Sequence, residues 1–201
     1  MTTSQSTTQD RTAEPARKRA DARLNTDALL EAAKAEFAER GVDAPVRTIA
    51  ERAGVGVGTL YRHFPLRSDL ISAVFRREMD ATVAEAADLE AAFPPGEALD
   101  RWILRFTRFV ATKRGLAAAL HSGDAAYEPL AEYFATRLTP TLERLLEAAT
   151  RDGTVQQEVD AADFLGAVAS LCHGAGPVPD AAEHPERMVR LLLAGLRTPA
   201  S

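Results

Sequence analysis

The apolar residues of the chain recur at helical intervals, and few of them alternate with polar residues as they would in β-strands. In the first helical segment the apolar positions i, i+3 and i+7 are Leu30, Ala33 and Phe37. Asn25 or Thr26 is a suitable cap for this helix, and Gly41 is a suitable stop. The pattern predicts an all-α protein whose first helix runs from about residue 26 to residue 40.

The stretch from residue 53 to residue 64, AGVGVGTLYRHF, has three glycines at alternate positions. A dinucleotide-binding loop needs a buried strand before GxGxxG, but the preceding TIAERA is helical and Thr59 stands at the sixth position. A P-loop needs GK[ST], which is missing. The segment is therefore interpreted as a helix-turn-helix. A short second helix over residues 46–53 ends in a left-handed cap at Gly54, and a third helix begins at Gly56.

The third helix has the two faces that a DNA recognition helix needs. Leu60 and Phe64, four residues apart, form the face that packs inward. The positions left outside or on the rim are Val57, Gly58, Thr59, Tyr61, Arg62 and His63. Hydroxyl, imidazole and guanidinium groups suit phosphate oxygens and base edges, and a glycine lets the backbone approach the groove closely. This helix is therefore expected to bind double-stranded DNA.

Residues 25 to 75 resemble the amino-terminal domain of the tetracycline-repressor (TetR) family of bacterial transcriptional regulators. The resemblance rests on FAERG at the end of the first helix, on IAERAGV, on GTLYRHF and on the following F-P-x-[KR]-x-x-L, in the family's order and spacing. It implies a ligand-responsive regulator, most often a repressor. Two departures weaken it locally: Pro45 and Gly56 replace the family's usual capping Ser or Thr, and Val57 replaces a polar residue.

The same resemblance implies a role for each residue at the DNA. Phosphate contacts are implied for Tyr61 and His63, for Arg47 in the second helix and for Arg67 at the start of the fourth. Contacts with base edges are implied for Val57 and Gly58, and a contact with the backbone or a base for Thr59. Thr48 and Arg62 complete the predicted DNA surface. The residues alone leave ordinary packing open for Tyr61, and ordinary solvation open for His63, Arg47 and Arg67.

The net charge of −5 is unevenly distributed along the chain. Residues 1 to 79 carry 13 Lys and Arg against 11 Asp and Glu, whereas residues 80 to 201 carry 11 against 18. A polyanion is therefore expected to dock only on the amino-terminal part. The expected organisation is a disordered basic arm over residues 1–23, a helix-turn-helix domain over residues 24–66 and a helical ligand-binding and dimerisation domain over residues 67–201. The arm, with Arg17, Lys18, Arg19 and Arg23, is either a solvated tail or a DNA contact.

After Pro65 the apolar spacing predicts a long connecting helix, residues 67–89, and further helices near residues 99–110, 127–151, 161–174 and 184–196. A pocket for an unidentified small-molecule effector is expected among their aromatic and histidine side chains. Its predicted lining is Trp102, Phe106, Phe109, His121, Tyr127, Phe134 and His173. The alternative is a plain aromatic core with unrelated histidines.

The last two predicted helices have more apolar surface than one small subunit readily hides. Their position resembles that of the family's two carboxy-terminal helices and implies a homodimer with a four-helix interface. The predicted interface residues are Phe164, Val168, Leu171, Met188, Leu192 and Leu196. Two-fold symmetry then predicts a roughly palindromic operator whose two recognition helices lie about one DNA turn apart, ~34 Å.

Two other classes of protein are alternatives. An enzyme would need a catalytic constellation, but the sequence has no GxSxG, HExxH or CxxC and only four scattered histidines, so no catalytic residues, metal or cofactor are expected. A helical adaptor would use the same helix-turn-helix for protein contacts and would bind without the salt dependence of a DNA complex. The polar start and the short apolar stretches predict a cytoplasmic protein that does not associate with membranes.

Overall fold

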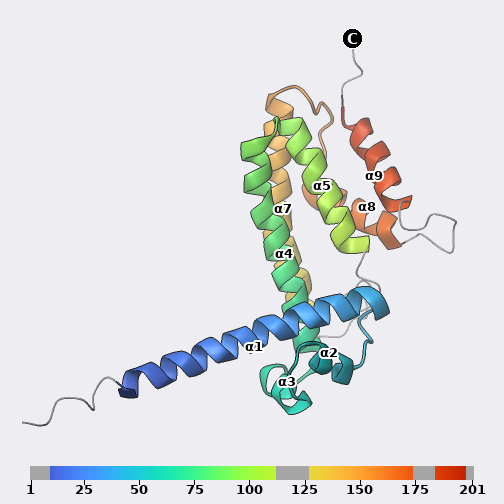
Figure 1. Ribbon diagram of the computed structural model, residues 1–201. Helices are drawn as coiled ribbons and strands as arrows, with labels where there is room; N and C mark the ends of the chain where they lie inside the picture. The colour runs from blue at the N-terminus through green and yellow to red at the C-terminus, as the bar shows by residue number, and fades with distance from the viewer. Residues whose placement is uncertain (1–9, 112–126, 174–183, 198–201) are drawn as a thin grey trace, which may run out of the picture. The chain divides into compact units, whose positions relative to one another are not determined.

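The computed structural model describes residues 10–111, 127–173 and 184–197, and the described chain is mostly helical (Figure 1). The helices are α1 (Asp10–Arg40), α2 (Val46–Arg52), α3 (Val57–His63), α4 (Arg67–Ala92), α5 (Pro95–Ala111), α7 (Glu128–Arg151), α8 (Ala161–His173) and α9 (His184–Gly195). One isolated antiparallel bridge joins Val155 and Arg197. The all-α fold expected from the sequence is confirmed. No helix in the described ranges is long and apolar enough to span a membrane.

The chain divides into two compact units, residues 1–74 and residues 75–201. The division falls inside α4, whereas the sequence pattern predicts a boundary after Leu66. The reason is that Leu70, Ile71 and Val74, in the first two turns of α4, are buried in the same unit as the helix-turn-helix. The helical register alone does not reveal where along a continuous helix one core ends and the next begins.

Helix α1 begins earlier than the sequence pattern predicts. It starts at Asp10, so residues 10–23 of the predicted disordered arm are helical; residues 1–9 lie outside the described part of the chain. Ala, Arg, Lys and Glu dominate this segment, and their high helix propensity lets the helix extend with little apolar surface to bury. Thr26 is consequently not a cap: it lies inside α1, and its hydroxyl donates a hydrogen bond to the Ala22 carbonyl at 2.9 Å.

The end of α1 agrees with the prediction from the sequence. Gly41 has a φ of 78°, and its amide donates to the Phe37 carbonyl at 3.0 Å. A left-handed residue of this kind ends a helix and is most easily supplied by glycine. The turn places Val42 and Ala44 in buried positions directly before α2.

The second unit packs around α5, which contacts α7, α8 and α9. The indole of Trp102 is fully buried and donates from Nε1 to the Thr82 carbonyl of α4 at 2.8 Å. Helices α4 and α7 are joined by polar contacts: the Tyr133 hydroxyl donates to Asp80 Oδ1 at 2.7 Å, and Arg144 donates to Glu90 at 3.0 Å. The hydrogen bond to Asp80 raises the pKa of Tyr133, because the nearby carboxylate disfavours a phenolate.

Candidate nucleic-acid interface

The turn between α2 and α3 is built from backbone hydrogen bonds that only a left-handed residue completes. The Val55 amide donates to the Ala50 carbonyl at 3.0 Å, and the Gly54 amide donates to the Glu51 carbonyl at 3.1 Å. This pair of bonds is the Schellman arrangement that ends a helix. Gly54 has the required φ of 69°. The left-handed cap predicted at Gly54 is confirmed, and it sets the direction in which the chain enters α3.

Helices α2 and α3 begin without side-chain caps. Pro45 and Gly56 occupy the two N-cap positions, and neither makes a side-chain hydrogen bond to its helix. The Gly56 carbonyl accepts from the Thr59 amide at 2.8 Å, so the first turn of α3 is closed by backbone bonds alone. Both helices have only seven residues, so tertiary packing must supply most of their stability.

Helix α3 has a buried and an exposed face, as its sequence predicts. Leu60 is 1% exposed and Phe64, directly after the helix, is 8% exposed. On the other face, Val57 is 37% exposed and Tyr61 is 51% exposed, which is unusual for side chains of this size. Gly58 is also exposed. The helix therefore presents a mixed apolar and polar surface that no other described part of the chain covers.

The polar side chains of this surface hold one another in place. Arg62 is exposed and donates from Nε to the Gly58 carbonyl at 3.2 Å and from Nη2 to the Thr59 hydroxyl at 3.0 Å. In α2, Arg47 forms an exposed ion pair with Glu51 at 3.1 Å, and Thr48 is half-buried beside it. An exposed pair of this kind contributes little to stability, so either guanidinium can exchange its present partner for a phosphate at small cost.

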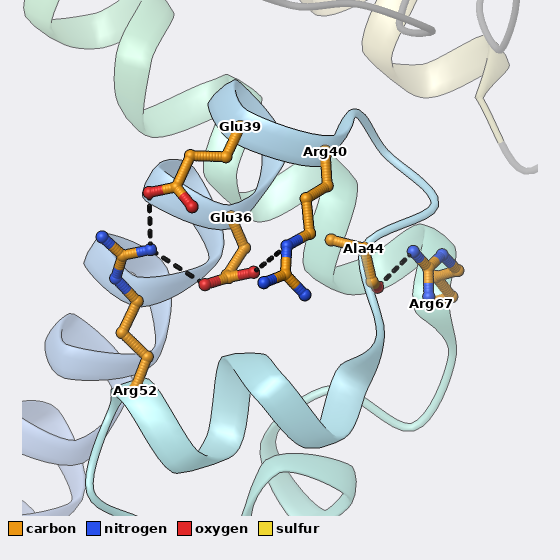
Figure 2. A network of polar contacts seen from close by, with 6 residues as sticks. All are labelled: Glu36, Glu39, Arg40, Ala44, Arg52 and Arg67. Carbon is orange, nitrogen blue, oxygen red and sulfur yellow. Dashed lines mark hydrogen bonds and ion pairs between the residues drawn. The ribbon is translucent and has the colours of Figure 1, made fainter.

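Arg67 has a different environment from the one that the resemblance implied. Its guanidinium donates to the Val42 carbonyl and, at 2.7 Å, to the Ala44 carbonyl, both in the loop between α1 and α2. These bonds satisfy the carbonyls of two buried residues and tie the start of α4 to that loop; Figure 2 shows the bond to Ala44. The structure thus gives Arg67 a structural role, and we leave it out of the proposed DNA surface.

A buried carboxylate that sequence reasoning did not single out joins α1 to α2. Glu36 is 3% exposed, and its Oε1 accepts from Arg52 Nη1 at 2.8 Å (Figure 2). Its Oε2 lies 3.4 Å from Arg40 Nε, close enough for an ion pair but not aligned for a hydrogen bond. Arg52 also binds Glu39 at 2.9 Å, and its hydrogen bonds to Glu39 and then Glu36 raise the pKa of the guanidinium.

A sequence signal for Glu36 existed. It stands seven residues after Leu29 and three after Ala33, so it interrupts the buried stripe of α1 with a charge. A charged residue in an apolar stripe indicates a buried ion pair. Its partner could not be predicted, because Arg52 reaches it only through the packing of α2 on α1.

His63, at the last position of α3, contacts α1. Its Nδ1 lies 3.1 Å from the Thr26 hydroxyl oxygen, and both side chains are half-buried. The imidazole is therefore held on one edge by the protein, while Tyr61 on the same helix is more than half exposed. This contact fixes the position of a side chain for which the resemblance implied phosphate binding.

The predicted ligand pocket corresponds to a tightly packed aromatic cluster in the second unit. The rings of Trp102 and Phe106 are stacked with their centres 6.0 Å apart, and Phe106 lies 6.3 Å from Phe109 and 5.8 Å from Phe134. Trp102, Phe106 and Phe109 are buried, whereas Phe134 and Tyr127 are half-buried. His121 lies outside the described residues, and so does the side chain of His173 at the end of α8, so the structure tests neither histidine.

An open groove lies elsewhere in the same unit. It has a volume of about 840 Å³ and is lined by the carboxy-terminal half of α7, the following loop and the first residue of α8. Leu146, Val155 and Val159 supply apolar surface, and the acidic residues around them are Glu143, Glu147, Glu158 and Asp160. The volume is within the range of small-molecule sites, about 300–1,000 Å³. The sequence did not predict this groove, because its walls come together only in the folded unit.

The residues of the predicted dimer surface differ in how far their own subunit buries them. Phe164, Val168 and Leu196 are 3%, 0% and 7% exposed, so their own subunit already buries them. Leu171, Met188 and Leu192 are half-buried. Leu191, which the prediction omitted, is 64% exposed on α9. An apolar position in a helical stripe does not reveal whether its own subunit or a partner covers it, so the interface itself stays a prediction.

A three-helix unit with an exposed third helix, followed by a separate helical unit, defines a helix-turn-helix DNA-binding regulator. Residues 29–74 match the family model for bacterial regulatory proteins of the tetR family. Residues 94–198 match the model described as the carboxy-terminal domain of SbtR-like transcriptional regulators.

Solved structures agree with these matches. The TetR transcriptional regulator SCO0520 from Streptomyces coelicolor is 35% identical, with a TM-score of 0.68, over 87% of this chain and 99% of that one. A TetR transcription regulatory protein from Mycobacterium vanbaalenii is 36% identical, with a TM-score of 0.63, over 90% and 99%. A curated protein sequence matches as well. An HTH-type transcriptional regulator from Staphylococcus aureus strain USA300 is 43% identical over 63 residues, which are 31% of this chain and 34% of that protein.

The chain belongs to the TetR family of transcriptional regulators, and it is a DNA-binding protein. The curated relative matches over only about a third of its length, so it supports the amino-terminal assignment alone.

Proposed function

We propose that this regulator is a homodimer that binds a roughly palindromic operator through α3 of each subunit, acts as a repressor and releases the operator when a small-molecule effector binds. The observation that carries the DNA-binding part is the exposed face of α3. Tyr61 and Val57 lie open on a helix whose opposite face buries Leu60. The proposed DNA surface consists of Arg47, Thr48, Val57, Gly58, Thr59, Tyr61, Arg62 and His63.

Gly58 supports this assignment because the free protein gives no reason for a glycine there. A Cβ built at Gly58 would meet nothing within 4 Å, and its φ is not in the left-handed region. Alanine would fit and would favour the helix by about 1 kcal/mol. We infer that the missing side chain makes room for a molecule outside the chain, namely the edge of a DNA groove.

The Tyr61→Ala substitution is expected to weaken operator binding by at least about tenfold, because it removes a hydroxyl and a ring from the centre of the exposed face. The measurement is fluorescence anisotropy with the DNA upstream of the protein's own gene, repeated at several salt concentrations. Wild-type affinity should fall steeply with salt, and the variant should show a smaller salt slope if Tyr61 binds a phosphate.

The Tyr61→Phe substitution is the matched control, since it keeps the ring and removes only the hydroxyl. If the hydroxyl binds a phosphate, this variant loses most of the same affinity. Retained affinity would assign the interaction to the ring instead. Binding of wild-type protein that does not respond to salt would contradict DNA binding through phosphates and favour the adaptor alternative.

The dimer is proposed to form through α8 and α9, with Leu191 at its centre. The Leu191→Arg substitution should shift the protein from dimer towards monomer, with a dissociation constant at least about tenfold higher, because it places a charge in an apolar contact. Sedimentation equilibrium measures this directly. The control is Leu66→Arg, since Leu66 in the first unit is similarly exposed at 62%. Equal monomer fractions in both variants would contradict this interface.

Two locations are available for the effector, and they favour different chemistry. The aromatic cluster suits an apolar effector that opens its packing, whereas the groove with four acidic residues suits a cation with an apolar body. We propose the aromatic cluster, because its half-buried member Phe134 borders the buried ring of Phe106. Trp102 is the single tryptophan of the chain, so its fluorescence distinguishes the two locations during effector screening.

A further inference from the structure

We propose that the amino-terminal part of α1, residues 10–25, is a second DNA-binding element, which binds backbone phosphates of the duplex beside those that α3 reaches. The inference rests on the proposed function, because that function places DNA at α3. It adds a surface that the helix-turn-helix itself does not contain. Phosphate contacts carry no sequence information, so this element raises the affinity for DNA of any sequence.

The evidence begins with the distribution of charge around the helix. Each residue of an α-helix is turned by about 100° from the one before, so positions i, i+4 and i+7 share a face. Arg19, Arg23 and Thr26 have this spacing inside α1. Carried through residues 10–25, the register places four of the five cations on the half of the helix centred on Thr26 and all three carboxylates on the other half. The cationic face consists of Arg11, Lys18, Arg19 and Arg23, and the opposite half carries Asp10, Glu14, Arg17 and Asp21.

The cationic face continues the side of α1 that packs on the first unit. Leu29, Ala33 and Phe37 are buried, and in the same register they lie on the half of the helix centred on Thr26. The Thr26 hydroxyl oxygen lies 3.1 Å from Nδ1 of His63, at the end of α3. The half of the helix that carries the cations is therefore the half on the same side of α1 as α3.

Residues 10–25 extend beyond the core of the first unit. Ala22, Arg23 and Leu24 are exposed, Leu24 at 66%. From Thr26 to Asp10 the helix is about 24 Å long at 1.5 Å per residue, and Figure 1 shows this part of α1 passing α3 and projecting past it. The exposed face of α3 is turned away from the core that buries Leu60, so a duplex bound there lies on the side of α1 that carries the cationic face.

Duplex DNA matches this face in its chemistry. It is a continuous polyanion, and guanidinium groups form charge-assisted, often bidentate hydrogen bonds with phosphates. A helix holds its cations at a fixed spacing, and here it keeps the three carboxylates of the segment on the half away from the DNA. A segment that served only to be solvated would gain nothing from this separation of opposite charges.

The test measures affinity by fluorescence anisotropy at several salt concentrations, for the DNA upstream of the protein's own gene and for a duplex of unrelated sequence. Arg19→Ala and Arg23→Ala should each weaken binding to both duplexes by the same factor, about threefold or more, and should each lower the salt slope by about one. Alanine has the highest helix propensity, so neither change should shorten α1, and circular dichroism checks this.

Arg17→Ala is the matched control. It removes the same type of residue from the same segment and changes the net charge equally, but its position is on the opposite half of the helix. Because charges that make no contact are screened by salt, it should change the affinity by less than about twofold. Equal losses for Arg17→Ala and Arg19→Ala would overturn the inference, since the net charge of the segment and not the cationic face would then determine binding.

The double variant Arg19→Ala, Arg23→Ala separates this inference from the proposed function. Salt-dependent wild-type binding that falls in Tyr61→Ala but is unchanged in the double variant would overturn the inference and leave the proposed function intact. Salt-independent wild-type binding would contradict the proposed function itself. Phosphate-ethylation interference gives an independent result: the double variant should become insensitive to some of the phosphates whose ethylation blocks wild-type binding. Identical interference patterns would overturn the inference.

Discussion

The Trp102→Ala substitution should destabilise the second unit by about 3–5 kcal/mol, the usual cost of removing a buried tryptophan. The side chain is fully buried, stacks on Phe106 with an interplanar angle of 7° and donates from Nε1 to the Thr82 carbonyl of α4. Its removal leaves a cavity between α4 and α5 and deletes one buried hydrogen bond. For a unit of this size the expected fall in melting temperature is roughly 10–20 °C.

Urea unfolding followed by circular dichroism measures this change in stability, since the variant has no tryptophan fluorescence. Trp102→Phe is the matched control: it keeps most of the ring packing and loses the hydrogen bond, which should cost about 1–2 kcal/mol. Stability of Trp102→Ala close to that of the wild type would mean that the cluster tolerates empty space around Phe106. In that case the rings would have to be described as the wall of a cavity and not as packed core.

This outcome also bears on the effector. If the aromatic cluster is a packed core, an effector that enters it must separate rings that now touch, and its binding free energy is reduced by that cost. An effector that occupies the acidic groove would meet no such cost, because that groove is already open. The free energy of unfolding of Trp102→Ala and the change in wild-type Trp102 fluorescence on effector binding are independent quantities. Together they distinguish an effector in the aromatic cluster from one in the acidic groove.

Local features of the helix-turn-helix could be predicted from the sequence because each depends on a few neighbouring residues. Gly54 and Gly41 end α2 and α1 with the positive φ angles that glycine allows. The spacing of Leu60 and Phe64 fixed which face of α3 is buried, and Pro45 and Gly56 indicated the missing side-chain caps. None of these conclusions required knowledge of another helix.

The errors concern features that depend on packing between helices. Thr26 is a residue type that often caps the start of a helix, but α1 already begins at Asp10. The Thr26 hydroxyl therefore lies inside the helix and contacts Ala22 and His63 instead. The phosphate contact implied for Arg67 stays an untested prediction, but its hydrogen bonds to the loop carbonyls of Val42 and Ala44 could not be foreseen from the sequence. In each case a polar side chain with several possible partners takes the one that tertiary structure brings nearest.

Glu36 is the clearest example of a residue whose role only the folded structure reveals, and its replacement should have the second large effect. The Glu36→Ala substitution is expected to destabilise the first unit by about 1–3 kcal/mol, because it removes the acceptor that joins α1 to Arg52 of α2. The second helix has only seven residues and no side-chain cap, so it is held by the packing of Ile49 and Ala50 and by this ion pair. Operator affinity should fall as well, since α2 and its turn position α3.

The matched control for this experiment is Glu51→Ala. Glu51 is also a helical glutamate paired with an arginine, Arg47, but both side chains are mostly exposed, at 65% and 84%. Its replacement should change the free energy of unfolding by less than about 0.5 kcal/mol.

Glu36→Gln separates the effect of charge from that of shape, because it keeps the side-chain volume and can still accept a hydrogen bond from Arg52 through its carbonyl oxygen. An intermediate destabilisation for Gln would assign part of the effect to the charge of the carboxylate, which pairs with both Arg52 and Arg40. Equal stabilities for Glu36→Ala and Glu51→Ala would mean that apolar packing alone holds α2 on α1 and that the buried carboxylate contributes nothing measurable to the recognition unit.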